Sequence, residues 1–259
     1  MTHLQLQKII NWFSRYTRTF TSNDSDFSSP IQLKVDHSQK VANNARQLAE
    51  ESGWNSMEIN MAEALGWLHD IGRFSQFAEF GTFSDAASVN HGERGWEVVR
   101  QSGILAPLES TKRTALLDGI RYHNAKTEPD HLTKESLRFL KLIRDADKLD
   151  ILRFVLESVQ KDGFQALPGM LPQVVLDAPL SPQILSEIQQ HRSCSIKKIH
   201  SLADFLLMQL AWIYDLNFPA TFRLITNRHI IDDLERSLPK TQPVQQLVQN
   251  IRAYALQSC

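Results

Sequence analysis

His69 and Asp70 stand side by side in the segment GWLHDIGR, residues 66–73, at the end of an apolar stretch and just before a glycine. An imidazole nitrogen and a carboxylate in this arrangement can both serve as ligands of one metal ion. A pair at a helix end can also hydrogen-bond to the backbone, so the pair alone does not decide the function. The other histidines and aspartates of the chain must decide it.

Further candidate ligands follow at intervals of roughly one helix. They are His37, His91, His123 and Asp147. Like His69, each falls on the apolar stripe of a predicted helix, because apolar residues recur around it at spacings of three and four. Val41 and Ala45, for example, continue the stripe of His37. The pattern therefore turns the candidate ligands toward the core.

Five predicted helices thus each bring a candidate ligand to the core. A buried histidine is usually an ordinary core residue, but a buried aspartate is costly unless it is paired or bound to a metal. Ligands that project from facing helices are a known way to build a metal site in a bundle. The convergence of these side chains therefore favours metal binding. The predicted ligands are His37, His69, Asp70, His91, His123 and Asp147.

The predicted fold class is all-α, in a single domain over residues 1–259. Alternation of β-branched residues is absent from the first 160 residues, and a chain of this length and apolar content can bury a large core. The bundle core is expected over about residues 31–155, with C-terminal helices over about 181–259 packing on it. The strongly apolar helix at residues 202–216 is expected to be core, or an interface of a homo-oligomer if it is exposed.

Local signals set the expected helix limits. An amphipathic helix is predicted at residues 6–20, and after a polar connection a long helix is predicted to start at Ser29 and Pro30, an N-cap followed by proline. Asn55 is expected to cap the next helix. Residues 73–90 contain four phenylalanines without a sustained period, and they are predicted to form an ordered loop over or beside the site.

Composition excludes several classes of protein. The net charge is −1 and no basic stripe is present, so a nucleic acid polymer is not an expected partner. The two cysteines, Cys194 and Cys259, fit a reducing compartment better than a disulfide framework. Residues 1–8 do not read as a signal peptide, and the apolar run at residues 205–213 is too short for a membrane span. We expect a soluble cytoplasmic protein without a membrane partner.

The order H…HD…H…H…D, over about residues 31–155, resembles the HD superfamily of metal-dependent phosphohydrolases and, within it, the members with two metal ions. The resemblance implies that His37, His69, Asp70 and Asp147 form the core ligand set, that His91 and His123 hold a second ion, and that Asp70 bridges the two. Four imidazoles favour iron, manganese or another transition metal over magnesium or calcium.

The resemblance also implies a reaction. A metal-bridging hydroxide, activated at Asp70, would attack a phosphomonoester or phosphodiester of a small, nucleotide-like molecule. Arg73, in the motif HDxxR, and Lys148, in DADK, would bind the phosphate, with Arg94 and Arg121 as weaker candidates. The chain has no phosphate-binding loop of the NTPase type, and it lacks the glycine-and-tyrosine signature of cyclic dinucleotide phosphodiesterases.

Two alternatives remain open at this stage. The same six ligands resemble those of mixed-valent di-iron oxygenases such as myo-inositol oxygenase, in which the cluster activates dioxygen. A nucleotide-binding sensor without catalysis is a further alternative, although every ligand position is filled.

Overall fold

The computed structural model describes residues 1–21 and 25–259. The described residues form helices, as predicted, and their only bridge of β type is an isolated one between Val175 and Ser201. The chain divides into two compact units, Met1–Asp150 and Ile151–Cys259. The single-domain organisation, with the C-terminal helices packing on the bundle, stays a prediction. Among the described helices, none has the length and apolar character needed to cross a membrane.

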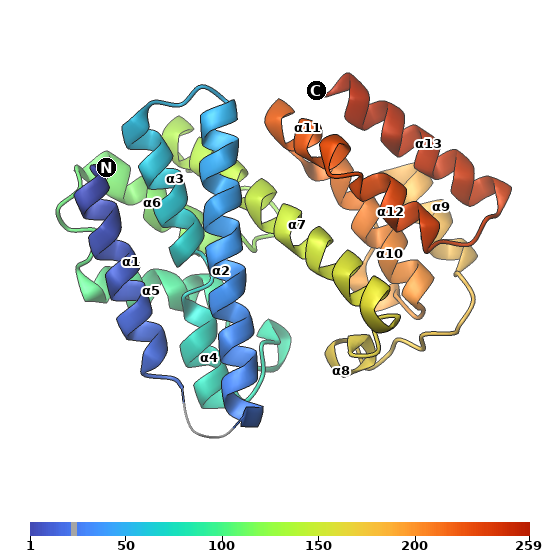
Figure 1. The fold of residues 1–259 in the computed structure, drawn as a ribbon, viewed down its shortest axis with the longest axis horizontal. Helices are drawn as coiled ribbons and strands as arrows, with labels where there is room; N and C mark the ends of the chain where they lie inside the picture. Colours follow the sequence, from blue (N-terminus) through green and yellow to red (C-terminus); the bar gives the residue numbers. More distant parts are fainter. Residues whose placement is uncertain (22–24) are drawn as a thin grey trace. The chain divides into compact units, whose positions relative to one another are not determined.

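The first unit contains the predicted bundle (Figure 1). Its helices are α1 (His3–Arg18), α2 (Ser25–Glu51), α3 (Ser56–Leu68), α4 (Gly72–Phe80), the short 3-10 helix η1 (Asp85–Ala87), α5 (His91–Ser102), α6 (Ser110–Tyr122) and the first part of α7 (Lys134–Asp162). Helix α3 packs against both α1 and α2, and α5 packs against α4 and α6. Asn55 caps α3 through a capping box with Glu58, as predicted.

Two glycines let helices of the first unit approach closely. A methyl group in place of the Gly66 hydrogen would lie 2.3 Å from Cα of Ala42, so α3 and α2 touch backbone to backbone. A methyl group on Gly72 would lie 2.2 Å from the carbonyl oxygen of His91, which places the start of α4 against the first turn of α5. These approaches bring the histidines of α2, α3 and α5 within reach of one another.

The predicted start of the long helix at Ser29 and Pro30 is wrong. Helix α2 begins at Ser25, and Pro30 lies inside it. A proline within a helix removes one backbone hydrogen bond, and the full burial of the next residue, Ile31, offsets this loss. Residues 22–24 of the predicted polar connection lie outside the described residues.

The predicted loop over residues 73–90 is helical in its first half. Helix α4 covers Gly72–Phe80, and Gly81 ends it in the left-handed conformation. Nine residues are too few to show a clear helical period, so the spacing of the phenylalanines does not distinguish a helix from a loop here. The second half, residues 81–90, lies beside the candidate ligands, because Asp85 contacts His91.

The second unit holds the end of α7 and the remaining helices. These are α8 (Leu167–Met170), α9 (Pro182–His191), η2 (Ile196–Lys198), α10 (Leu202–Ala211), η3 (Trp212–Asp215), α11 (Pro219–Asn227), α12 (Ile230–Arg236) and α13 (Gln242–Gln257). Every residue of α10 from Asp204 to Ala211 is buried, and Ser201 caps this helix. The apolar segment is therefore part of the core of its unit, which was the first of the two expectations. A homo-oligomer stays a prediction.

Candidate metal centre

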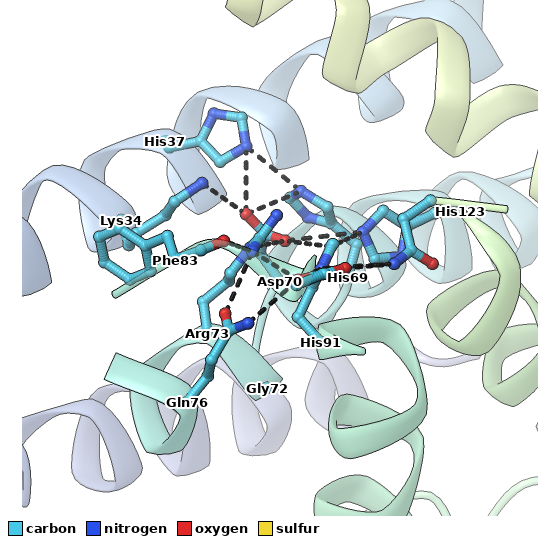
Figure 2. A network of polar contacts seen from close by, with 12 residues as sticks. Lys34, His37, His69, Asp70, Gly72, Arg73, Gln76, Phe83, His91 and His123 are labelled. Carbon is cyan, nitrogen blue, oxygen red and sulfur yellow. Dashed lines mark hydrogen bonds and ion pairs between the residues drawn. The ribbon is translucent and has the colours of Figure 1, made fainter. Parts of the chain in front are cut away.

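Asp70 lies at the centre of the predicted ligands, immediately after the end of α3 (Figure 2). Its Oδ1 is 3.3 Å from Nε2 of His91 and 3.5 Å from Nε2 of His123. Its Oδ2 is 3.6 Å from Nε2 of His37 and 3.9 Å from Nε2 of His69. Each oxygen of this carboxylate therefore faces its own pair of imidazoles.

The first imidazole pair joins α2 to the end of α3. Nε2 of His37 and Nε2 of His69 are 3.3 Å apart. The other nitrogen of His69 donates to the carbonyl oxygen of Gly66 at 2.8 Å, and Nδ1 of His37 is 2.7 Å from Oδ2 of Asp150. A carbonyl or carboxylate oxygen only accepts, so each Nδ1 carries a proton and each Nε2 is directed at the centre.

The second imidazole pair repeats this arrangement between α5 and the end of α6. Nε2 of His91 and Nε2 of His123 are 3.0 Å apart. Nδ1 of His123 donates to the carbonyl oxygen of Ile120 at 2.8 Å, and Nδ1 of His91 lies 2.7 and 2.8 Å from the two oxygens of Asp85. In both pairs the two Nε2 atoms point at each other.

Asp147 completes the first pair from α7. Its Oδ1 lies 3.1 Å from Nε2 of His37 and 3.8 Å from Nε2 of His69, and this buried oxygen has no hydrogen-bond partner among the described residues. Two Nε2 atoms that point at each other, beside a buried carboxylate oxygen without a hydrogen-bond donor, are unfavourable unless a proton or a metal cation lies between them. The residues present therefore fit a divalent metal.

The surroundings of the centre shift the pKa values of three of its histidines. Burial lowers the pKa of His69 and of His91 to about 4, so both are neutral near pH 7. Burial and Lys34 also oppose protonation of His37, but the adjacent carboxylates of Asp147 and Asp150 outweigh them and raise its pKa to about 9. A proton on His37 thus occupies the position that a metal would take.

Asp70 is held in its ionised form. Burial alone would raise the pKa of this carboxyl, but the ammonium of Lys34 and the neighbouring His69 hold it well below its usual range. Nζ of Lys34 donates to Oδ2 of Asp70 at 2.8 Å, as Figure 2 shows. The remaining five histidines of the chain, by contrast, are exposed: His3, His131, His191, His200 and His229.

The predicted phosphate contacts differ in their surroundings. Nη1 of Arg73 donates to the carbonyl oxygen of Phe83 and to Oδ1 of Asp85 at 2.9 Å, while its Nε is 3.5 Å from Oδ1 of Asp70. Arg73 is therefore next to the centre and bound to protein groups. Lys148 is half-buried on α7, one residue after Asp147.

The two weaker candidates are paired elsewhere. Arg94 forms an ion pair with Glu79, and Arg121 forms one with Glu93 and stacks on Trp96. Both guanidinium groups are thus engaged by a glutamate of a neighbouring helix, although Nη1 of Arg94 is buried without a hydrogen-bond partner in the described part of the chain.

Sequence reasoning missed three residues of the centre. Lys34 lies one helical turn before His37, and Asp150 lies one turn after Asp147 in the segment DADKLD, so helical spacing from a predicted ligand could have found both. Asp85 lies in an irregular segment, and no spacing rule connects it to His91.

Comparison with known proteins agrees with the geometry. Residues 35–152 match the family model described as HD domain, and the match includes all six predicted ligands. Comparisons with curated proteins and with solved structures gave no match. The centre built around His69 and Asp70 thus lies in a segment, residues 35–152, that is similar to the HD domain, and its clustered histidines and aspartate are compatible with metal binding, as in the HD superfamily of metal-dependent hydrolases.

Proposed function

We propose that this protein is a phosphohydrolase that uses two transition-metal ions and cleaves a phosphomonoester or phosphodiester of a small, nucleotide-like molecule. The observation that carries the proposal is the position of Asp70, because each of its oxygens faces a separate pair of imidazoles. A carboxylate in this position can bind one cation with each oxygen. His37, His69 and Asp147 would complete one position, and His91 and His123 the other.

The donor set supports the metal class. Four imidazole nitrogens and two carboxylates suit iron or manganese, whereas magnesium and calcium prefer shells made of oxygen. Two such ions, when bound, acidify a water enough to supply hydroxide near neutral pH and withdraw charge from a phosphoryl group.

The positive side chains around Asp70 support an anionic substrate. Nζ of Lys34 is on the Oδ2 side of this carboxylate, and Nε of Arg73 is on the Oδ1 side. Both side chains are mostly buried, with 20 % and 17 % of their surface exposed, so solvent screens their charge less than it screens a surface charge. We propose that Lys34, Arg73 and Lys148 bind phosphoryl oxygens and stabilise the charge that develops on them.

An anaerobic assay of the manganese-loaded protein against a panel of phosphoesters tests the reaction. Release of phosphate, or of a phosphomonoester from a diester, in the absence of oxygen supports the hydrolase. Oxygen consumption restricted to the iron form, without phosphoesterase activity in any metal form, would instead support an HD-type di-iron oxygenase. Tight binding of a nucleotide without turnover would support a sensor.

A further inference from the structure

Asp85 gathers the polar groups on one side of the metal centre. It lies in η1, in the segment between α4 and α5, and its carboxylate accepts hydrogen bonds from Nδ1 of His91 and from Nη1 of Arg73. It also accepts from Nε2 of Gln76 at 3.0 Å and from Nδ2 of Asn124 at 3.1 Å. Four side chains therefore fix the position of this carboxylate, and the carboxylate in turn fixes theirs.

The contact with His91 sets the direction of a metal-binding nitrogen. Because Nδ1 of His91 donates to Asp85, its Nε2 is left as the acceptor, and this atom lies 3.3 Å from Oδ1 of Asp70. The carboxylate also makes the imidazole a stronger donor to a metal. Of the two histidines at this position, His91 is held by a side chain, whereas His123 is held by the backbone of its own helix.

The contact between Asp85 and Arg73 also affects Oδ1 of Asp70. Nε of Arg73 is buried without a hydrogen-bond partner and lies 3.5 Å from Oδ1 of Asp70, while Nη1 is held by Asp85. Without Asp85, this guanidinium would lose an anionic partner and could turn toward Asp70. It would then compete for the oxygen that a cation at His91 and His123 requires.

The other imidazole pair has a different anchor. Nδ1 of His37 is held by Asp150, whose side chain is 6 % exposed on α7, whereas the side chain of Asp85 is 31 % exposed on a short segment. The two halves of the centre thus depend on carboxylates from separate elements. A change at one anchor leaves the other in place.

We propose that Asp85 is a positioning residue that selectively sets occupancy of the metal position formed by Asp70, His91 and His123. The proposal rests on the two-ion part of the proposed function. It predicts that loss of this one carboxylate, which is not itself a ligand, converts a two-ion protein into a one-ion protein.

Titration of the metal-free full chain with Mn²⁺, followed by calorimetry and by electron paramagnetic resonance, tests the proposal. For Asp85→Ala we expect affinity for one of two ions to fall about 10 to 100-fold, the usual effect of removing the hydrogen-bond partner of a ligand, with the other ion unaffected. With one equivalent of Mn²⁺ per chain, Asp85→Ala should give the spectrum of an isolated Mn²⁺ ion. With two equivalents, the wild-type protein should give the spectrum of two coupled ions. The affinity of Asp85→Asn for this ion should lie between the affinities of the wild-type protein and of Asp85→Ala, because the amide oxygen of Asn still accepts a hydrogen bond from His91 but carries no charge.

Matched variants separate positioning from a general loss of structure. Asp130→Ala removes an exposed aspartate of the same unit and should bind both ions as the wild-type protein does. Asp150→Asn should weaken the other ion. The proposal is overturned if Asp85→Ala binds both ions with unchanged affinity, if it weakens both equally, or if the wild-type protein binds fewer than two. These counts need no substrate, so a protein that binds two ions and hydrolyses nothing would contradict the proposed function alone.

Discussion

Nε2 of His91 and Nε2 of His123 lie 3.0 Å apart, and each lies within 3.5 Å of Oδ1 of Asp70. Neither imidazole can donate from this nitrogen while its Nδ1 holds the proton. The pair is therefore arranged for a cation and not for a hydrogen bond. On the other side of Asp70, where Nε2 of His37 and Nε2 of His69 are 3.3 Å apart, a proton on His37 takes the place of the cation.

The first prediction concerns this pair. His91→Ala should retain one metal ion per chain and its helical content, because it removes one ligand of one position and leaves His37, His69 and Asp147 intact. Elemental analysis and circular dichroism measure the two properties. His3→Ala, at an exposed histidine, serves as the control. Retention of two ions by His91→Ala would show that this histidine is not a ligand.

Metal removal should destabilise the protein. A ligand that binds only the folded state at about 100 times its dissociation constant adds about 2.7 kcal/mol, so chelation should lower the midpoint of thermal unfolding. The shift between Mn²⁺-loaded and chelator-treated protein should be smaller in His91→Ala than in the wild-type protein. Equal unfolding midpoints with and without metal would contradict binding of metal ions by the folded protein.

Metal affinity should rise with pH up to about 9. His37, with its pKa raised to about 9, is protonated in the metal-free protein near pH 7, so an ion must displace this proton. His69 and His91, with pKa values of about 4, are already neutral and add nothing in this range. Calorimetry in buffers of different ionisation enthalpy should therefore detect proton release at pH 7. Binding of Mn²⁺ without proton release, and with constant affinity from pH 6 to pH 9, would contradict this assignment.

The close approach of α2 and α3 should be sensitive to a single methyl group. Gly66→Ala would place that group 2.3 Å from Cα of Ala42, so we expect a loss of about 1 to 3 kcal/mol in the free energy of unfolding and weaker metal binding. Gly169→Ala, where a methyl group meets nothing within 4 Å, is the matched control. Urea unfolding compares the two, and equal stabilities would be the contrary result.

Lys34 provides a prediction about the substrate. If its ammonium binds a phosphoryl oxygen, Lys34→Ala should lower kcat/KM for a phosphoester about 10 to 100-fold, in line with a charge-assisted hydrogen bond. Lys34→Arg should recover part of this loss, and Lys126→Ala, at an exposed lysine, should have no effect. Unchanged kcat/KM in Lys34→Ala would remove this residue from the substrate site.

The helices and the assembly of the six predicted ligands could be predicted because both depend on local spacing. His37 shares the stripe of Val41 and Ala45, and burial of that stripe carries the histidine to the centre. Asp85 could not be found in this way. Its distance from His91 depends on the path of an irregular segment, which leaves no period in the sequence. Helix α4 escaped prediction because it is short, and the start of α2 because its proline lies inside the helix.

The number of metal ions held by the wild-type chain tests the central claim most directly. Protein purified, stripped with a chelator and reconstituted with Mn²⁺ should contain two ions per chain by elemental analysis, because Asp70 presents one oxygen to each pair of imidazoles. One ion or none per chain, in protein that keeps its helical content, would contradict the account.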